Sequence, residues 1–455
     1  KNSFDDTEMN LIVSKAINEG ILVFYENHSE SDHNLHINIG AFIVTKSNLS
    51  HILWRSDEPV WEKIFPKKDY PKLHFIGYIF ELHEIRLFYA TDKGEVIDFL
   101  VPIPFSKKHI ADKEGIKLEK HHTNPVLTPL GCNEWESVAT FNPAAIEIDG
   151  TTHLLYRAHG PNGMSVIGYA SSEDGINFTE RHGDPIYIPR TSFEGLHVPK
   201  DMKTPHYSSG YGWGGCEDPR ITCIDDNIYM IYAAYNGYEQ ARLAVSHISK
   251  EDFLNHNWNW SDPQMMSPQP TVFGTGNKNG ALFPEKINGK YVIFHRIWPN
   301  ISIDYVDDLD FSSNDKWLEV RDIIPPRKTM WDSSKIGVGA PPIKTKYGWL
   351  VIYQSVGRDG KYKIGAMLLD LQNPAKVICR THKPILEPND WYENHGLKAG
   401  VAYPCGSVVK DGKLFVYYGA ADTVVCVATA DLETFLKEML ENKTNTGLVS
   451  KKKVV

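Results

Sequence analysis

The segment with the densest concentration of reactive groups is residues 211–222, which read Tyr-Gly-Trp-Gly-Gly-Cys-Glu-Asp-Pro-Arg-Ile-Thr. It places two carboxylates, Glu217 and Asp218, and the guanidinium of Arg220 around one proline, beside a glycine-rich loop. Glycine lets a backbone approach a ligand closely, and a carboxyl group among other charges can act as an acid or a base. The segment therefore predicts an acid–base site, and an ordinary turn with a surface salt bridge is the alternative.

The elements that must position this segment are short strands. From about residue 135 onward, runs of β-branched and aromatic residues alternate with Asp-Gly, Asn-Gly and Gly-Lys turns, which predicts many antiparallel strands. A strand, turn, strand and Asp-containing turn recur at 168–178, 243–253, 303–311 and 366–375. Repeats of roughly 40 to 60 residues with several strands each favour a radial β-propeller over a sandwich.

The first hundred residues resemble the last of these repeats. Residues 20–25 (Gly-Ile-Leu-Val-Phe-Tyr) are similar to residues 348–353 (Gly-Trp-Leu-Val-Ile-Tyr), and residues 39–42 to residues 364–367. An arginine and a proline also keep their offsets from a glycine, with Gly40, Arg55 and Pro59 matching Gly365, Arg380 and Pro384. The N-terminal part is therefore interpreted as a degenerate copy of the C-terminal strands.

The chain is accordingly divided into four parts. We expect a β-rich appendage at 1–107, a charged linker at 108–120, the main domain at 121–445 and a basic tail at 446–455. Two apolar stripes at helical spacing predict helices at 6–18 and at 432–440, each packed against a sheet edge.

Composition excludes several function classes. Of the 455 residues, 42% are hydrophobic and 23% are charged, and the net charge is −9, so we expect no nucleic-acid partner. No run approaches the roughly 18 apolar residues of a membrane helix, and we expect no membrane partner. The first residues lack a signal-peptide pattern, but the chain does not begin with Met, so a removed leader stays open.

The cysteines and histidines predict neither disulfides nor a metal. The cysteines lack Cys-x-x-Cys spacing, which is typical of free thiols in a reducing compartment, and we expect a cytoplasmic location. They are Cys132, Cys216, Cys223, Cys379, Cys405 and Cys426. The nineteen histidines form no His-x-His or His-Glu-x-x-His cluster, and no Rossmann or Walker loop is present, so we expect no metal and no cofactor.

Residues 211–222 resemble the signature of glycoside hydrolase family 130, the β-mannoside phosphorylases and mannosidases, and the resemblance extends over roughly residues 120 to 440. Further matching segments follow in the family's order: 141–143 (Phe-Asn-Pro), 154–157 (Leu-Leu-Tyr-Arg), 277–286, 335–337 (Lys-Ile-Gly), 348–353 and 417–422. The resemblance implies an all-β, five-bladed β-propeller with a mannosyl unit in its central funnel.

The resemblance also implies roles for the acidic segment. By position, Asp218 is the general acid, and an acid protonated near neutral pH needs a raised pKa, from burial or from the adjacent Glu217. Asn142, Arg157 and Arg220 look like the residues that bind sugar hydroxyls and hold the acid in place. The predicted substrate-binding residues are Asn142, Arg157, Glu217, Arg220 and Asp422.

The family acts with inversion, and the attacking group is either phosphate or water. A phosphorylase needs a cluster of cations and donors, whereas a hydrolase needs a second carboxylate to activate water. The phosphate-binding positions implied by the resemblance, with one further cation, are Lys278, Asn279, Arg296, Lys335, Gln354 and Tyr362. Gln354 departs from the pattern, since related phosphorylases carry His there and Gln adds no charge.

The sequence thus favours a phosphorylase that uses inorganic phosphate as co-substrate to release α-mannose 1-phosphate from a β-mannoside. A β-mannosidase with Glu285 or Glu393 as base is the close alternative, and a non-catalytic glycan-binding propeller is the second. The acceptor sugar, the linkage and the oligomeric state are not predicted.

Overall fold

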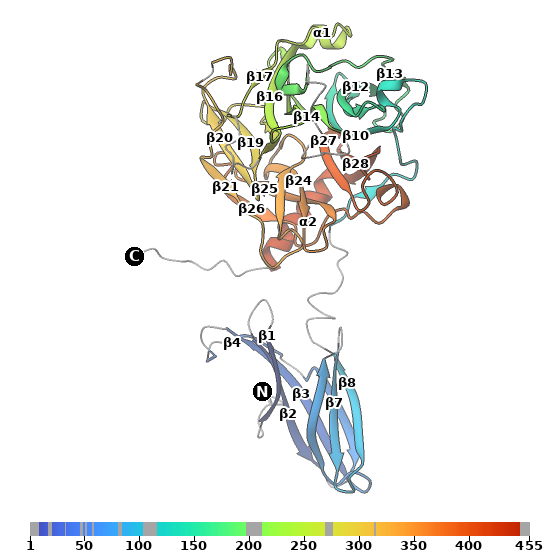
Figure 1. Cartoon of the computed structure of the whole chain (residues 1–455). Coiled ribbons are helices and arrows are strands. Elements are labelled where there is room, and N and C mark those ends of the chain that lie inside the picture. The colour runs from blue at the N-terminus through green and yellow to red at the C-terminus, as the bar shows by residue number, and fades with distance from the viewer. Residues whose placement is uncertain are drawn as a thin grey trace. The chain divides into compact units, whose positions relative to one another are not determined.

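The computed structural model describes residues 9–16, 21–31, 33–45, 49–50, 52–56, 59–80, 84–102, 116–196, 212–268, 276–313 and 315–445. The chain divides into two compact units, Lys1–Glu114 and Gly115–Val455. Both are built almost wholly from strands, as the cartoon of Figure 1 shows. The all-β class expected from the sequence is therefore confirmed. Among the described residues, no helix combines the length and the apolar character needed to cross a bilayer.

The first unit contains two packed sheets. Its strands are β1 (Met9–Ala16), β2 (Ile21–Glu30), β3 (Asn34–Val44), β4 (Ile52–Arg55), β5 (Trp61–Pro66), β6 (Leu73–Phe80), β7 (Glu84–Thr91) and β8 (Val96–Pro102). One sheet has the order β1-β2-β3-β4 with β5 also on β3, and the other has the order β6-β7-β8. Apolar side chains from both sheets share one core, so each sheet buries one face against the other.

The helix predicted at 6–18 is wrong over its described part, because residues 9–16 form strand β1. This strand pairs antiparallel with β2, and its register shifts between Leu11 and Val13. The shift places Ile12 and Val13 together in the core while Leu11 is exposed, which imitates a helical stripe. β-branched residues at a sheet edge are stabilised more by strand pairing than they would be in a short helix.

The second unit begins with β9 (Glu119–Lys120), so residues 116–120 belong to it. An eight-stranded sheet follows, with β10 (Ala139–Ile148), β11 (Thr151–His159), β12 (Met164–Ser172), β13 (Glu180–Arg181), β14 (Gly214–Ile224), β15 (Asn227–Tyr235), β16 (Arg242–Ser249) and β17 (Gln264–Met265). Its pairings are antiparallel except for a two-residue parallel contact between β12 and β14.

Three further sheets complete this unit. They contain β18 (Asn277–Leu282), β19 (Tyr291–Ile297), β20 (Asn300–Val306) and β21 (Asp322–Ile324); then β22 (Lys335–Val338), β23 (Ile343–Thr345), β24 (Gly348–Val356), β25 (Tyr362–Leu369) and β26 (Val377–Arg380); then β27 (Ala402–Lys410), β28 (Lys413–Ala420) and β29 (Val424–Asp431). Strand β9 pairs with β29, so the start of the unit is hydrogen-bonded to its last sheet.

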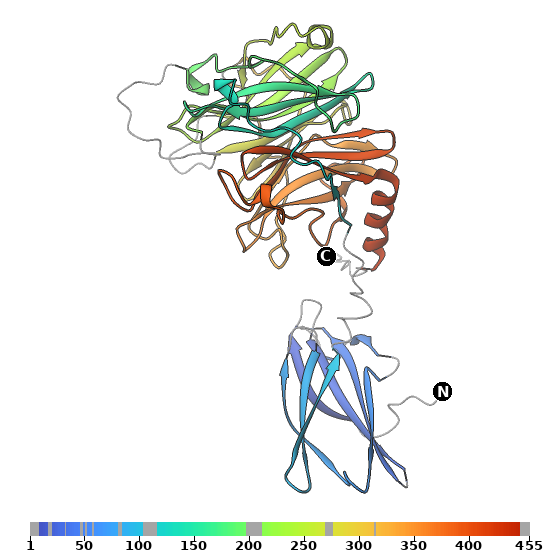
Figure 2. The same ribbon diagram turned by 90° about the vertical axis from the view of Figure 1, so that its right-hand side faces the viewer.

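Helices occupy little of the described chain. Besides the short α1 (Lys250–Leu254) and three 3-10 turns, α2 (Leu432–Asn445) follows the last strand, which confirms the helix predicted at 432–440. Figure 2 shows α2 beside the C-terminal strands, and Phe435, Leu436 and Met439 on its apolar face are buried in their core.

A tyrosine–glycine–arginine arrangement recurs across three adjacent strands. In each case the tyrosine on the first strand is paired with a glycine on the second strand. The residue two positions after that glycine, also on the second strand, is paired with an arginine on the third strand. The three sets are Tyr25, Gly40 and Arg55; Tyr156, Gly168 and Arg181; and Tyr353, Gly365 and Arg380. A methyl group on any of these glycines would overlap the tyrosine ring, and each arginine lies over that ring.

Candidate active site

Strand bulges place three polar side chains at equivalent points of the second unit. The first strand of three successive antiparallel groups, β10, β14 and β18, shifts register just after it begins. At these bulges Asn142, Asp218 and Asn279 adopt the left-handed region, with φ of 49°, 51° and 55°. This backbone conformation costs free energy at residues other than glycine, so its repetition at three bulges indicates a functional constraint. Tyr211, the first residue of the predicted acidic segment, lies outside the described residues.

Asp218 is buried and held by one of its two carboxylate oxygens. Its Oδ1 accepts a hydrogen bond of 2.8 Å from Asn142 Nδ2 and one of 3.2 Å from an Arg157 guanidinium nitrogen. No hydrogen bond to Oδ2 is made within the described part of the chain. Oδ2 is therefore the atom that a ligand can reach, while Oδ1 fixes its orientation.

Glu217 connects the cations on either side of Asp218. This fully buried carboxylate forms ion pairs with Arg157 at 3.0 Å and with Lys278 at 3.1 Å. Arg157 also donates from Nε to Ser165 Oγ at 3.0 Å, so its guanidinium is held on several sides. Both oxygens of Glu217 are engaged in these pairs, so Glu217 supports the two cations here, and the sugar contact expected from the sequence stays a prediction.

Arg220 likewise supports the backbone and contacts no open space. Its guanidinium donates to the carbonyl oxygens of Asp218, Gly339 and Val338 at 2.7, 2.9 and 3.4 Å. These contacts tie β14 to the end of β22 and fix the bulge at the acid. The expectation that Arg220 holds the acid in place agrees with this geometry, and the sugar contact expected of its guanidinium stays a prediction.

The pKa of Asp218 is lowered to about 2, which contradicts the raised value expected from the sequence. Burial raises this pKa, but Arg157, Arg220 and Lys278, together with the hydrogen bond from Asn142, outweigh it. The sequence argument counted the adjacent carboxylate of Glu217 and missed the surrounding cations. In the ligand-free site Asp218 is therefore an anion.

Asp422 lies in the three-residue turn 421–423 between β28 and β29. Ala421 and Asp422 have φ of 49° and 51°, and Thr423 N donates to Ala420 O at 3.0 Å. The left-handed conformation costs free energy at residues other than glycine, so its presence at both Ala421 and Asp422 points to a functional constraint on this turn. Burial, partly offset by Lys398 and Arg157, raises the pKa of Asp422 to about 6.

A second cluster gathers cations around Tyr362. Lys335 Nζ donates to Tyr362 Oη at 2.6 Å and lies 4.6 Å from its ring centroid. Lys398 Nζ also lies 4.6 Å from this centroid. Burial alone would raise the pKa of Tyr362, but Lys335, Lys398 and Arg296 lower it, which identifies a site that favours negative charge. Arg296 Nε is buried without a hydrogen-bond partner among the described residues.

Gln354 acts through Asn279 in this structure. Its Nε2 donates to Asn279 Oδ1 at 3.2 Å, and Asn279 Nδ2 donates to Tyr403 Oη at 2.5 Å. Gln354 is fully buried, so it orients the amide of Asn279 and presents no charge. Gly337 leaves room for this contact, because a Cβ there would lie 2.5 Å from both amide groups.

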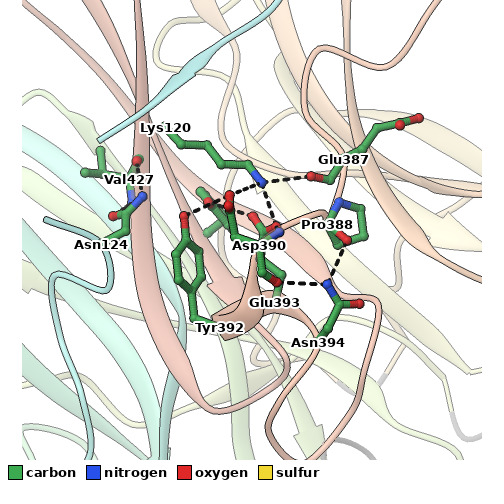
Figure 3. Close-up of polar contacts among 10 residues, drawn as sticks. Lys120, Asn124, Glu387, Pro388, Asp390, Tyr392, Glu393, Asn394 and Val427 are labelled. Atoms are coloured by element: carbon green, nitrogen blue, oxygen red, sulfur yellow. Dashed lines mark hydrogen bonds and ion pairs between the residues drawn. The ribbon is translucent and has the colours of Figure 1, made fainter. Parts of the chain in front are cut away.

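Neither carboxylate proposed as the base of a hydrolase joins these clusters through a contact among the described residues. Glu285 is exposed and paired with Lys344 at 2.6 Å. Glu393 is fully buried and accepts from Lys120 at 2.6 Å and from Tyr418 Oη at 2.9 Å, as Figure 3 shows for the lysine. Lys120 also contacts Asp390 at 2.8 Å, so these residues fasten β9 to the loop after β26.

Sequence reasoning missed Lys398 and Tyr403. Lys398 lies in the segment Gly-Leu-Lys-Ala-Gly (396–400), which matches no motif, and only its glycines signal a tight loop. Tyr403 follows that loop and contacts the amide of Asn279. No group of three or more His, Cys, Asp or Glu side chains in the described ranges is arranged to hold a metal ion.

Comparisons with known proteins place this site in a class. A family model described as beta-1,4-mannooligosaccharide phosphorylase matches residues 117–441. A 1,2-beta-oligomannan phosphorylase from Thermoanaerobacter sp. (strain X514) is 39% identical over 325 residues, which is 70% of this chain and 98% of that protein. A beta-1,2-mannobiose phosphorylase of the same strain is 38% identical over 330 residues, with 70% and 98% covered.

A solved structure described among the GH130 glycoside hydrolases that target beta-1,2 mannosidic linkages in Candida mannan is also similar. It is 26% identical, with a TM-score of 0.57, and the match covers 71% of this chain and 96% of that one. These matches define a carbohydrate-active enzyme. The chain belongs to glycoside hydrolase family 130, because the family model covers well over half of it. The family resemblance expected from the sequence is thereby confirmed.

Proposed function

We propose that this protein is an inverting phosphorylase that cleaves a β-mannoside with inorganic phosphate and releases α-mannose 1-phosphate. One observation carries the proposal: a carboxylate with one open oxygen lies beside buried cations, and a second group of cations surrounds Tyr362. The relatives described above are phosphorylases of β-1,2-linked mannosides, which supports a β-1,2-linked oligomannan as the substrate.

The second unit is proposed to be a five-bladed β-propeller. Dividing the eight-stranded sheet at its parallel β12–β14 contact leaves five antiparallel groups, and β9 completes the last of them. The first unit is proposed to be a degenerate relative of such blades, because Tyr25, Gly40 and Arg55 keep the arrangement of Tyr353, Gly365 and Arg380.

In the proposed reaction, Asp218 Oδ2 gives a proton to the glycosidic oxygen as the bond from that oxygen to the mannosyl C1 breaks. Phosphate attacks C1 from the opposite face, so a new C1–O bond forms with inverted configuration. Asn142 and Arg157 orient the acid, and Asp422 accepts hydrogen bonds from the sugar hydroxyls. Lys278, Asn279, Arg296, Lys335 and Tyr362 are the proposed phosphate contacts, with Gln354 orienting Asn279.

Asp218 must gain a proton before it can act, although its pKa is about 2 in the ligand-free site. Lys278 contributes to this low pKa and is also a proposed phosphate contact. Phosphate bound to Lys278 offsets part of the positive charge around Asp218, and a bound sugar removes water from it. Both changes raise the pKa of Asp218 when the two substrates are present together.

Phosphorolysis is favoured over hydrolysis by the positions of the candidate bases. Glu285 is exposed and paired with Lys344, and Glu393 is fully buried among hydrogen-bond donors, so neither is available to activate water. Phosphate needs no base, because it is already a nucleophile. Phosphate needs instead a cluster of cations that binds its negative charge, and the residues around Tyr362 supply such a cluster.

The test is product analysis of the purified enzyme with β-1,2- and β-1,4-linked mannosides, each with and without phosphate. We expect phosphate-dependent mannose 1-phosphate, and its loss in Asp218→Asn. Asp225→Asn is the matched control, since Asp225 is exposed and has a φ of 52° at the other end of the same hairpin. Free mannose in both buffers would establish a hydrolase instead, and binding without turnover would establish a glycan-binding module.

A cytoplasmic location is proposed on the state of the thiols. All six cysteines are free, as the sequence predicted, and Cys216, Cys405 and Cys426 are buried. Free thiols persist in a reducing compartment, where inorganic phosphate is also at hand for the reaction.

A further inference from the structure

The 396–400 loop is fixed against the turn that carries Asp422. Lys398 N donates to Ala421 O at 3.0 Å, and Leu397 N donates to Thr423 Oγ1 at 2.8 Å. Gly396 packs so closely on Thr423 that a side chain there would overlap it. Three contacts therefore hold the loop backbone against this turn, and they fix the backbone position of Lys398.

The side chain of Lys398 extends toward the same ring as Lys335. Both ammonium nitrogens lie 4.6 Å from the centroid of Tyr362. In the described ranges the Lys398 ammonium group forms no ion pair with a carboxylate, whereas Lys278 is paired with Glu217. Among the described residues, Lys398 thus brings to the Tyr362 cluster a positive charge that is not paired with a carboxylate.

The positive charge of Lys398 is important for phosphate binding because Gln354 adds no charge to the proposed phosphate site. Its amide is hydrogen-bonded to Asn279 and its Oε1 is buried without a partner among the described residues. A phosphate dianion is bound most strongly where several charged donors converge on it. Lys335, Arg296 and Lys398 are three such donors on three different segments, and all three act electrostatically on Tyr362.

We propose that Lys398 is a ligand of the phosphate co-substrate, and that it supplies from the 396–400 loop the charge that Gln354 lacks. The inference rests on the phosphorolysis proposed above and adds a residue to its phosphate site. The same ammonium group acts electrostatically on Asp422, the carboxylate that is proposed to bind the sugar hydroxyls.

The test measures steady-state phosphorolysis and the reverse synthesis in wild type, Lys398→Met and Lys398→Arg. Loss of one charge-assisted contact should raise the KM for phosphate and for α-mannose 1-phosphate by about tenfold to a hundredfold in Lys398→Met. The KM for the mannoside should stay within about twofold, and Lys398→Arg should recover most of the phosphate affinity. Lys361→Met is the matched control, because Lys361 is exposed and adjacent in sequence to Tyr362.

Phosphate binding measured by calorimetry, without turnover, gives a second readout. An unchanged phosphate KM and unchanged calorimetric affinity in a folded Lys398→Met variant would overturn the proposal, as would a rise confined to the mannoside KM. If the wild type turns over mannosides without phosphate, the proposed function fails as a whole. If it is phosphate-dependent and only the Lys398 variants behave like wild type, the function stands and this inference alone fails.

Discussion

Replacing Asp422 by asparagine should stabilise the protein in a pH-dependent way. Burial raises the folded-state pKa of Asp422 from its ordinary 3.8 to about 6. A carboxyl group with a raised folded pKa favours the folded state less and less as pH rises above the unfolded pKa, because the native state holds the proton more tightly. The penalty is complete once the pH exceeds the folded pKa.

The size of the effect follows from this difference in pKa. The shift from 3.8 to about 6 corresponds to about 3 kcal/mol at pH 8, at about 1.36 kcal/mol per pKa unit. At pH 5, where the folded carboxyl group is mostly protonated, the same relation gives about half of that penalty. Asparagine matches the shape of a protonated aspartate and tolerates the left-handed φ of 51° at this turn. Asp422→Asn should therefore gain about 3 kcal/mol at pH 8 and about half of that at pH 5.

The assay is urea unfolding of ligand-free protein from pH 5 to pH 8, with the transition of the second unit followed separately. Asp411→Asn is the matched control, because Asp411 is exposed and has a φ of 49° in the neighbouring β27–β28 turn. It should leave stability unchanged at each pH. A gain for Asp422→Asn that is the same at pH 5 and pH 8, or a loss at pH 8, would refute the assigned burial penalty.

Three other substitutions test the supporting contacts. Asp218→Asn should lower the free energy of unfolding by about 2 kcal/mol, equally at pH 5 and pH 8. The reason is that the pKa of this aspartate is lowered to about 2, so the stabilisation by its charged form is lost only in stronger acid. A higher free energy of unfolding in urea would contradict this. Gly419→Ala should displace Asn142, because Asn142 Oδ1 occupies the space that a Cβ at this position would need. We expect kcat to fall at least tenfold while circular dichroism shows that the fold is retained. Wild-type kinetics would contradict this packing argument. Lys120→Met should leave the buried Glu393 without its cation and cost about 3–5 kcal/mol in urea unfolding, whereas a loss under about 1 kcal/mol would mean that Lys120 is not its main partner.

The sequence was sufficient for the family and for the strand-rich architecture, and the structure brings several of the predicted site residues into contact. Turn residues and β-branched runs are local signals, so the strands from β10 onward could be predicted without long-range information. The helix expected at 6–18 failed because pairing with β2 is a long-range contact. A bulge there brought Ile12 and Val13 onto one face, and one extra residue in a strand imitates helical spacing over a short window.

The direction of each side chain was the part that the sequence could not supply. Arg220 stands two residues from Asp218, and nothing in that spacing shows that its guanidinium turns to the carbonyl groups of Gly339 and Val338. The pKa of Asp218 was misjudged for the same reason, since Arg157 and Lys278 come from 61 residues before and 60 after it and act only once the strands are assembled.

The pKa values of the two aspartates of the site are shifted in opposite directions for a physical reason. Asp218 has three buried cations around it and ionises readily, whereas burial of Asp422 is only partly offset by Lys398 and Arg157. Arg157 acts on both carboxyl groups, so any anion that draws positive charge away from the cluster raises both pKa values. In the proposed reaction phosphate is such an anion, and its binding beside Lys278 and Lys398 would favour protonation of Asp218 when the proton is needed. Separated environments for two nearby carboxyl groups thus allow the co-substrate to prepare the acid.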